Sequence, residues 1–168
     1  MIAIPVKSRK YKEDYFFIDG EDFDKIKMYK WSFSGNKRSK LYIAGLDYNK
    51  ITKKSKGIKL HRLIMDCPKN MMVDHIDGNP LNNCKSNLRI CTNSENLRNS
   101  DKRKDGLTSK YKGVCFDKSR NNFMSQIQFN KKHYSLGRYT NEEDAAIAYN
   151  NAAVKYFGEF AKLNKVEV

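Results

Sequence analysis

Residues 73–80 read Val-Asp-His-Ile-Asp-Gly-Asn-Pro, and this stretch decides how the middle of the chain folds. The apolar residues on either side of the Asp-His pair suit a short strand. The run Asp-Gly-Asn-Pro at its end predicts a reversal of chain direction, because these residue types favour turns. Residues 88–91, Leu-Arg-Ile-Cys, suit a second strand. We therefore predict two strands joined by a loop.

A helix is predicted directly after the second strand. Residues 92–95, Thr-Asn-Ser-Glu, fit a capping box, in which an N-cap hydroxyl and a Glu three positions later satisfy two backbone amides. Asn96 then lies about one turn inside the helix. The order strand, loop, strand, helix lets Asn96 fold back towards Asp74.

Four side chains of this segment have the chemistry that phosphodiester hydrolysis requires. Asp74 offers an anionic oxygen and Asn96 a neutral amide oxygen to a hard divalent ion such as Mg²⁺ or Mn²⁺. His75, with an ordinary pKa of about 6.5, is largely unprotonated at neutral pH and can accept a proton from water. Asn87 can hold His75 or its loop by hydrogen bonds. The Asp-His pair alone would be read as a plain turn, but the combination of the four favours hydrolysis.

The charge of the chain favours a polyanionic partner. Its 168 residues contain 33 Lys and Arg against 19 Asp and Glu, a formal net charge of +14. Residues 37–59 are rich in basic side chains, Lys53 and Lys54 among them, and contain a single acid, Asp47. Such a stretch with interleaved Tyr, Ser and Asn is typical of a segment that contacts a phosphate backbone. The alternative is a charged loop kept in solvent.

Other classes of protein are disfavoured. No apolar run approaches the ~20 residues that a membrane span needs, and residues 1–10 lack the apolar core of a signal peptide, so we expect an intracellular protein without a membrane partner. Four cysteines contain no C-x-x-C pair, which favours free thiols over disulfides or a zinc site. A structural zinc protein using Cys67, Cys84 and Cys91 is the alternative for the thiols.

The N-terminal segment, residues 1–59, mixes strand-like and helix-like pieces. Strands are expected at 15–18, 31–34 and 41–44, and a short helix capped by Asp22 is expected to run to Met28. The charged residues 101–108 are the best candidate linker between domains.

The C-terminal segment, residues 109–168, is predicted to form three strands and one helix. The strands are expected at 113–116, 123–129 and 133–137, with Gln126 and Gln128 on one face of the middle strand and Ser125 and Ile127 on the other. A capping box at residues 140–143 predicts a helix over 144–157 whose alanine-rich stripe packs on the sheet.

Residues 60–100 closely resemble the HNH (His-Asn-His) homing-type endonucleases of phages. The likeness rests on the quoted segments, on Leu-His-Arg-Leu-Ile at 60–64 and on Ser-Glu-Asn-Leu-Arg-Asn at 94–99. It implies a ββα-metal site with Asp74 and Asn96 as metal ligands, His75 as general base and Asn87 as the orienting residue. Asn96 stands where the family name has a histidine, and its neutral oxygen favours Mg²⁺ or Mn²⁺ over Zn²⁺. Arg89 and Arg98 could contact neighbouring phosphates.

Residues 109–164 resemble the DNA-binding domain of plant ethylene-response (APETALA-type) transcription factors. The likeness rests on Tyr-Lys-Gly-Val at 111–114, Leu-Gly-x-Tyr at 136–139, the alanine-rich helix and Asn164. Such domains lay a three-stranded sheet into the major groove. Together with strand parity, the resemblance implies DNA contacts from the following residues: Lys112, Arg120, Gln126, Gln128, His133 and Ser135. Several plant arginines and tryptophans are absent, so the target sequence does not transfer. Without the resemblance, a solvent-facing sheet explains these polar residues equally well.

These observations predict an α+β protein with four parts. These are a small N-terminal α/β segment that contacts DNA (1–59), a ββα-metal nuclease motif (60–100), a linker (101–108), and a C-terminal three-stranded antiparallel sheet packed on one helix (109–168). We expect an HNH endonuclease, of homing type, that cuts double-stranded DNA with one Mg²⁺ or Mn²⁺ ion as a monomer or a DNA-induced dimer. Its expected location is the cytoplasm of an infected or host bacterial cell. The alternative is a sequence-specific DNA-binding regulator whose nuclease motif is inactive.

Overall fold

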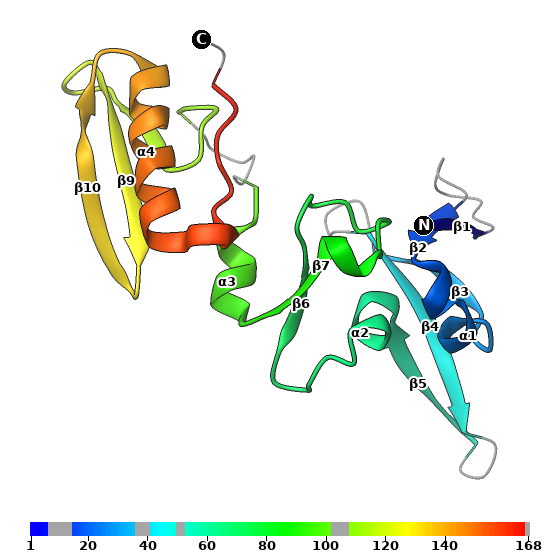
Figure 1. Cartoon of the computed structure of the whole chain (residues 1–168). Helices are drawn as coiled ribbons and strands as arrows, with labels where there is room; N and C mark the ends of the chain where they lie inside the picture. The colour runs from blue at the N-terminus through cyan, green and yellow to red at the C-terminus, as the bar shows by residue number, and fades with distance from the viewer. Residues whose placement is uncertain (7–14, 36–40, 50–52, 102–107, 167–168) are drawn as a thin grey trace. The chain divides into compact units, whose positions relative to one another are not determined.

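A computed structural model describes residues 1–6, 15–35, 41–49, 53–101 and 108–166. The chain divides into two compact units, Met1–Asn96 and Leu97–Val168, coloured blue to green and green to red in Figure 1. The architecture of the described residues is mixed α and β, with four small antiparallel sheets and four α-helices. The division falls inside the helix over Asn93–Arg98. Residues 102–107 of the predicted linker lie outside the described residues.

The first unit contains three of the sheets. Strand β1 (Ile2–Pro5) pairs with β2 (Tyr15–Ile18). The second sheet has the order β3 (Trp31–Ser34), β4 (Tyr42–Asn49) and β5 (Lys54–Lys59). The third pairs β6 (Met72–His75) with β7 (Leu88–Cys91). Helices α1 (Phe23–Ile26) and α2 (Leu60–Ile64) lie between these strands, and α3 (Asn93–Arg98) begins in this unit.

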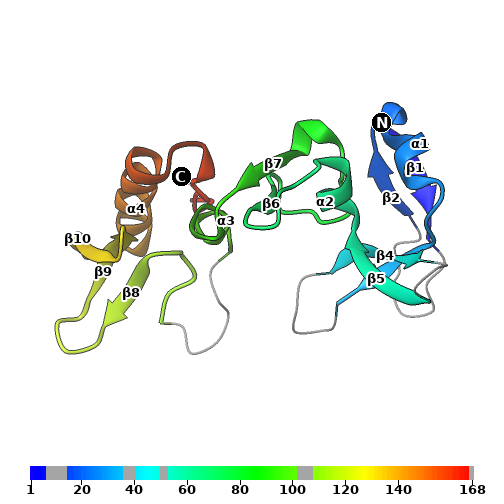
Figure 2. The same cartoon turned by 90° about the horizontal axis from the view of Figure 1, so that it is seen from below.

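One apolar core joins the three sheets of the first unit. Phe16, Ile43 and Leu60 are fully buried, and the same cluster extends to Val73 and Leu88. Residues before and after position 59 therefore fold around a common core. Figure 2 shows β6 and β7 side by side, with α2 next to them.

Strand β2 is also joined to the loop between β6 and β7. The Phe17 amide donates to the Leu81 carbonyl at 2.8 Å, and the Asn83 amide donates to the Phe17 carbonyl at 2.8 Å. A strand close to the N-terminus thus supports the loop that follows the Asp-His pair.

One local prediction in this unit is wrong. Asp22 makes no capping hydrogen bond, and the helix that it precedes ends at Ile26 rather than at Met28. The reason is tertiary, because the buried Asp22 carboxylate pairs with the Lys85 ammonium at 3.0 Å. The alternative reading of the basic stretch as a charged loop does not hold for its described part, because β4 and β5 pair along it as an antiparallel hairpin.

The second unit is a three-stranded sheet with a helix along one face. The sheet has the order β10 (Lys132–Tyr139), β9 (Asn122–Phe129) and β8 (Val114–Asp117). Helix α4 (Glu142–Phe157) lies along the sheet in both views (Figures 1 and 2). Its buried residues Ala145, Ala146, Tyr149, Ala152 and Ala153 allow this close approach.

Helix α4 begins at Glu142, two residues before the predicted start, and its N-cap is Asn141 rather than Thr140. The side chain of Asn141, not that of Thr140, accepts a hydrogen bond from the Glu143 amide at 2.8 Å. Asn side chains are among the best N-caps, so Asn141 takes the position that the capping box assigned to its neighbour. Among the described residues, no helix has the length and apolar character that crossing a membrane requires.

Candidate active site

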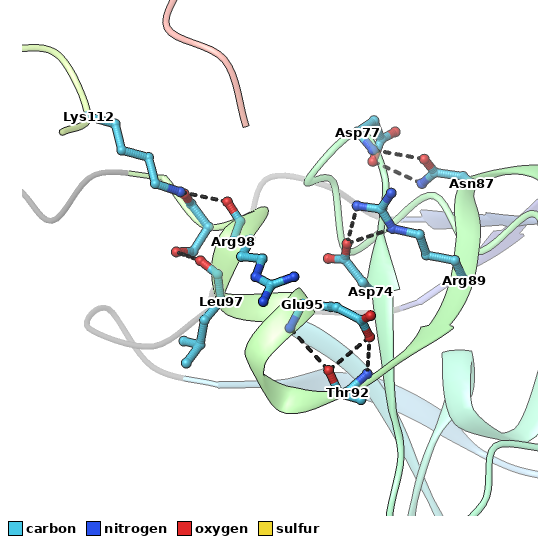
Figure 3. A network of polar contacts seen from close by, with 10 residues as sticks. Asp74, Asp77, Asn87, Arg89, Thr92, Glu95, Leu97, Arg98 and Lys112 are labelled. Atoms are coloured by element: carbon cyan, nitrogen blue, oxygen red, sulfur yellow. Dashed lines mark hydrogen bonds and ion pairs between the residues drawn. The ribbon is translucent and has the colours of Figure 1, made fainter. Parts of the chain in front are cut away.

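The loop between β6 and β7 is held closed by the side chain of Asn87. Its Oδ1 accepts from the Asp77 amide at 3.0 Å. Its Nδ2 donates to Asp77 Oδ1 and to the Asn82 carbonyl, each at 2.9 Å, and Figure 3 shows the Asn87–Asp77 pair. Asn87 therefore orients the loop, with both ends of its amide paired inside the protein.

The carboxylate of Asp77 accepts hydrogen bonds from several residues of this loop. It accepts from the Asn79 amide at 2.7 Å and from the Asn82 side chain at 3.0 Å. Burial alone would raise the pKa of the Asp77 carboxyl, but the hydrogen bonds from Asn79, Asn82 and Asn87 outweigh it and lower the pKa. Asp77 is thus ionised at neutral pH and serves to shape the turn.

Asp74 and His75 end strand β6 and are buried, with 3% and 6% of their surface exposed. Asp74 lies directly opposite Arg89 of β7 in the antiparallel register. Arg89 donates to Asp74 Oδ2 from Nε at 3.1 Å and from Nη2 at 2.8 Å (Figure 3). The Arg89 side chain, only 12% exposed, is therefore paired with Asp74 inside the first unit.

The imidazole of His75 is held by two residues that the sequence reasoning did not single out. His75 Nε2 lies 3.3 Å from Oδ1 of the fully buried Asn83. The ring of His61, from α2, packs edge-on against the His75 ring, with centroids 5.2 Å apart. A histidine inside the apolar run 60–65 was the available signal for His61, because buried polar side chains need a reason.

His61 is a neutral, buried imidazole. Burial, followed by the positive charges of His75, Lys59 and Arg62, lowers the pKa of His61 to about 3. Its other neighbour is the ring of Tyr42, 5.4 Å away, where burial and the negative charge of Asp74 raise the pKa of the phenol. The His75 ring thus packs against an uncharged aromatic surface.

The predicted capping box of α3 is present. Glu95 Oε2 accepts from the Thr92 amide at 2.7 Å, and the Thr92 hydroxyl accepts from the Glu95 amide at 3.3 Å (Figure 3). Asn96 lies half-buried in the first turn of this helix. Its backbone N–H donates to the Thr92 carbonyl at 3.1 Å. Strand β7 and the Thr92–Glu95 cap together fix the position of Asn96 in the first turn of α3.

The donors of this site fit a hard divalent ion with few protein ligands. Asp74 and Asn96 offer oxygen, which Mg²⁺ and Mn²⁺ prefer. Among the residues that the structure describes, no group of three or more His, Cys, Asp or Glu side chains is arranged to hold a metal. All four cysteines are free thiols. Most coordination positions at an Asp74–Asn96 site would therefore fall to water and phosphate.

Two further cations predicted to contact DNA are engaged inside the second unit. Lys112 Nζ donates to the carbonyls of Arg98 and Ser100, both at 2.6 Å, the former visible in Figure 3. Burial lowers the pKa of this ammonium to about 8. The Arg98 guanidinium lies over the rings of Phe129 and Phe157, 5.1 Å from each centroid. We therefore leave Lys112 and Arg98, like Arg89, out of the proposed DNA-contacting set.

The remaining predicted contacts are exposed. On the second unit, Gln126 and Gln128 of β9 lie opposite Ser135 and His133 of β10. All four are exposed, whereas Ser125 and Ile127 between them are buried, so the four side chains share the face opposite α4. Three of the cations predicted to contact DNA are also exposed, outside this face: Lys53, Lys54 and Arg120.

Removal of Arg89 is expected to destabilise the first unit strongly. In Arg89→Met the Asp74 carboxylate stays buried without its guanidinium, which should cost about 3–5 kcal/mol. Denaturation followed through Trp31, the single tryptophan, reports on the first unit. Lys27→Met is the matched control, because the Lys27–Asp24 pair at 2.7 Å is exposed and such pairs contribute ~0–1 kcal/mol. Equal losses for the two variants would contradict the buried role of Arg89.

The buried neutral state of His61 predicts acid sensitivity. Its folded pKa of about 3 lies below the ordinary value, so its contribution is complete above about pH 6.5 and is lost as pH falls towards 3. Between pH 7.5 and 4.5 the first unit should lose roughly 2–3 kcal/mol through this group. His61→Phe keeps an aromatic ring without a titrating nitrogen and should flatten the dependence. His133→Phe, at an exposed site, should leave it unchanged, and a full slope in His61→Phe would refute the assignment.

Comparison with known proteins identifies the family. Residues 59–98 match the HNH endonuclease family. An uncharacterised HNH endonuclease of Acanthamoeba polyphaga mimivirus is 32% identical over 162 residues, covering 93% of this chain and 78% of that protein. Protein 3.8 of Escherichia phage T7 is 33% identical over 95 residues, covering 56% of this chain and 77% of that protein. A prophage protein of Bacillus subtilis, named as an HNH homing endonuclease, is 45% identical over 56 residues, covering 30% of this chain and 32% of that protein. The chain therefore belongs to the HNH endonuclease family and is a DNA endonuclease.

Proposed function

We propose that this endonuclease hydrolyses DNA phosphodiester bonds with one divalent ion held by Asp74 and Asn96, and with His75 as the general base. The observation that carries the proposal is the end of strand β6. There Asp74 and His75 occupy the last two positions of a strand whose following loop is closed by Asn87. A rigid support of this kind keeps reacting groups in place.

Each protein group has a separate task. His75 takes the proton of the attacking water, for which a neutral imidazole at neutral pH is suited. Arg89 holds the orientation of the Asp74 carboxylate through its two hydrogen bonds to Oδ2. Asn87 keeps the loop closed through its bonds to Asp77 and Asn82. A bound Mg²⁺ or Mn²⁺ would supply charge neutralisation at the phosphate and at the departing 3′ oxygen.

The second unit is proposed to select the DNA site. Its exposed face carries amide, imidazole and hydroxyl groups from Gln126, Gln128, His133 and Ser135. Such groups read base edges in the major groove, whereas a lysine-rich surface mainly reads phosphates. The exposed Lys53 and Lys54, at the turn of the β4–β5 hairpin, are proposed to contact the phosphate backbone, as is Arg120.

One site per chain suggests nicking by a monomer, with double-strand cleavage requiring a dimer or two events. By family analogy the products carry 5′-phosphate and 3′-hydroxyl ends. The prophage relative carries the name of a homing endonuclease, and a homing role is proposed for this chain on that basis. The competing function is sequence-specific binding without cleavage.

Nicking of supercoiled plasmid tests the catalytic proposal. With Mg²⁺ the chain should convert the plasmid to the open-circular form, and EDTA should abolish the conversion. His75→Ala should lower the rate by ~10²-fold or more, the usual contribution of a general base. His133→Ala, which changes a histidine on the other unit, should retain nicking of this non-cognate substrate. Plasmid binding without nicking by the unmodified chain would favour the competing function.

Binding measurements at several salt concentrations separate the two kinds of DNA contact. The double variant Gln126→Ala, Gln128→Ala should lose discrimination among sites selected from a random duplex library, by ~1–3 kcal/mol per base read, with an unchanged salt slope. Lys53→Ala, Lys54→Ala should instead weaken binding to all sequences and reduce the slope by about 0.9 for each phosphate that the variant no longer neutralises. Asn151→Ala on the exposed side of α4 is the control. Unaltered site preference in the glutamine variant would remove the sheet from recognition.

A further inference from the structure

Asn83 is a buried amide whose orientation is determined by its own hydrogen bonds. None of its surface is exposed. Its Nδ2 donates to the Pro80 carbonyl at 3.1 Å, and its Oδ1 faces His75 Nε2 at 3.3 Å. A flipped amide would place two oxygens, Oδ1 and the Pro80 carbonyl, against each other. The carbonyl of Pro80 thus decides that Asn83 presents an acceptor to the histidine.

This acceptor determines the tautomer of His75. A neutral imidazole carries one N–H, and the nitrogen that faces a hydrogen-bond acceptor is the one that keeps the proton. Because the Asn83 amide oxygen can only accept, Nε2–H of His75 donates to it. The lone pair then lies on Nδ1, which makes Nδ1 the basic nitrogen.

The position of Asn83 is itself supported from two sides. The backbone N–H of Asn83 donates to the Phe17 carbonyl at 2.8 Å, and the backbone N–H of Phe17 donates to the Leu81 carbonyl at 2.8 Å. The residues flanking Phe17 in strand β2, Phe16 and Ile18, are fully buried in the core. Across the His75 ring, the edge-on contact with His61 resists rotation that would carry Nε2 away from Asn83.

We propose that Asn83 is a positioning residue that fixes the tautomer of His75, so that Nδ1 is the nitrogen that accepts the proton during hydrolysis. The inference rests on the proposed role of His75 as general base. It adds the identity of the reacting nitrogen and the residue that selects it. It also explains why the N-terminal strands belong to the same folded unit as the catalytic loop, since β2 holds the backbone of Asn83.

The test uses the full chain, labelled with ¹⁵N and without metal, at pH about 8.5, where an ordinary histidine is neutral. Long-range ¹H–¹⁵N spectra report which ring nitrogen carries the proton. The chain has three histidines, so His61→Phe and His133→Phe assign the signals. We expect the Nε2–H pattern for His75. An Nδ1–H pattern in the unmodified chain overturns the proposal, whatever the variants do.

Two substitutions at Asn83 separate hydrogen bonding from packing. Asn83→Asp keeps an accepting oxygen towards His75, and its second oxygen, which faces the Pro80 carbonyl, should bind a proton because burial raises the pKa of a carboxyl group. The Nε2–H pattern of His75 should therefore be kept. Asn83→Leu has a similar size without an acceptor, so His75 should become a mixture of tautomers and kcat for nicking should fall by ~10–100-fold, with KM for DNA unchanged. A Leu variant with native melting, unchanged tautomer and unchanged kcat would also overturn the proposal. The spectra need no cleavage, so retention of nicking by His75→Ala would sink the catalytic role of His75 separately.

Discussion

The hydrogen bonds of Asn87 are the constraint on which the site depends. They close the loop between β6 and β7 by joining Asn87 to the backbone and side chain of Asp77 and to the Asn82 carbonyl. The closed loop lets two short strands pair in one register. That register places Arg89 opposite Asp74, and the loop places Asn83 beside His75. An open loop would leave each of these buried polar groups with a desolvation cost and no partner.

The basic residues of this chain divide into two populations that composition alone does not separate. Arg89 and Lys112 donate to acceptors within their own units, and Arg98 lies over two aromatic rings. Lys53, Lys54 and Arg120 are exposed and remain available to a polyanion. A cation beside a buried carboxylate serves folding first, because its removal leaves an uncompensated buried charge at a cost of about 3–5 kcal/mol. The net charge of the chain therefore overstates the number of cations that are available to contact DNA.

Local sequence patterns predicted the elements whose signals are local. The strands at 72–75 and 88–91 and the Thr92–Glu95 cap depend on neighbouring residues, and all three are present. The predictions failed where distant residues intervene. Asp22 pairs with Lys85 instead of capping its helix. No strand was predicted at β1, which pairs with β2, and β5 forms a strand from a lysine-rich stretch by pairing with β4.

By itself the sequence determined the chemistry that this protein offers, because residue types such as Asp74, His75, Asn87 and Asn96 and their spacing are properties of the chain. It also determined the alternation that exposes Gln126 and Gln128 while burying Ile127. Only the tertiary structure decided what surrounds His75. Asn83 and His61 reach that ring from a loop and from α2, and their proximity follows from a core shared by residues far apart in the chain. Spacing along a sequence carries no record of such contacts, since burial and pairing arise when the segments pack.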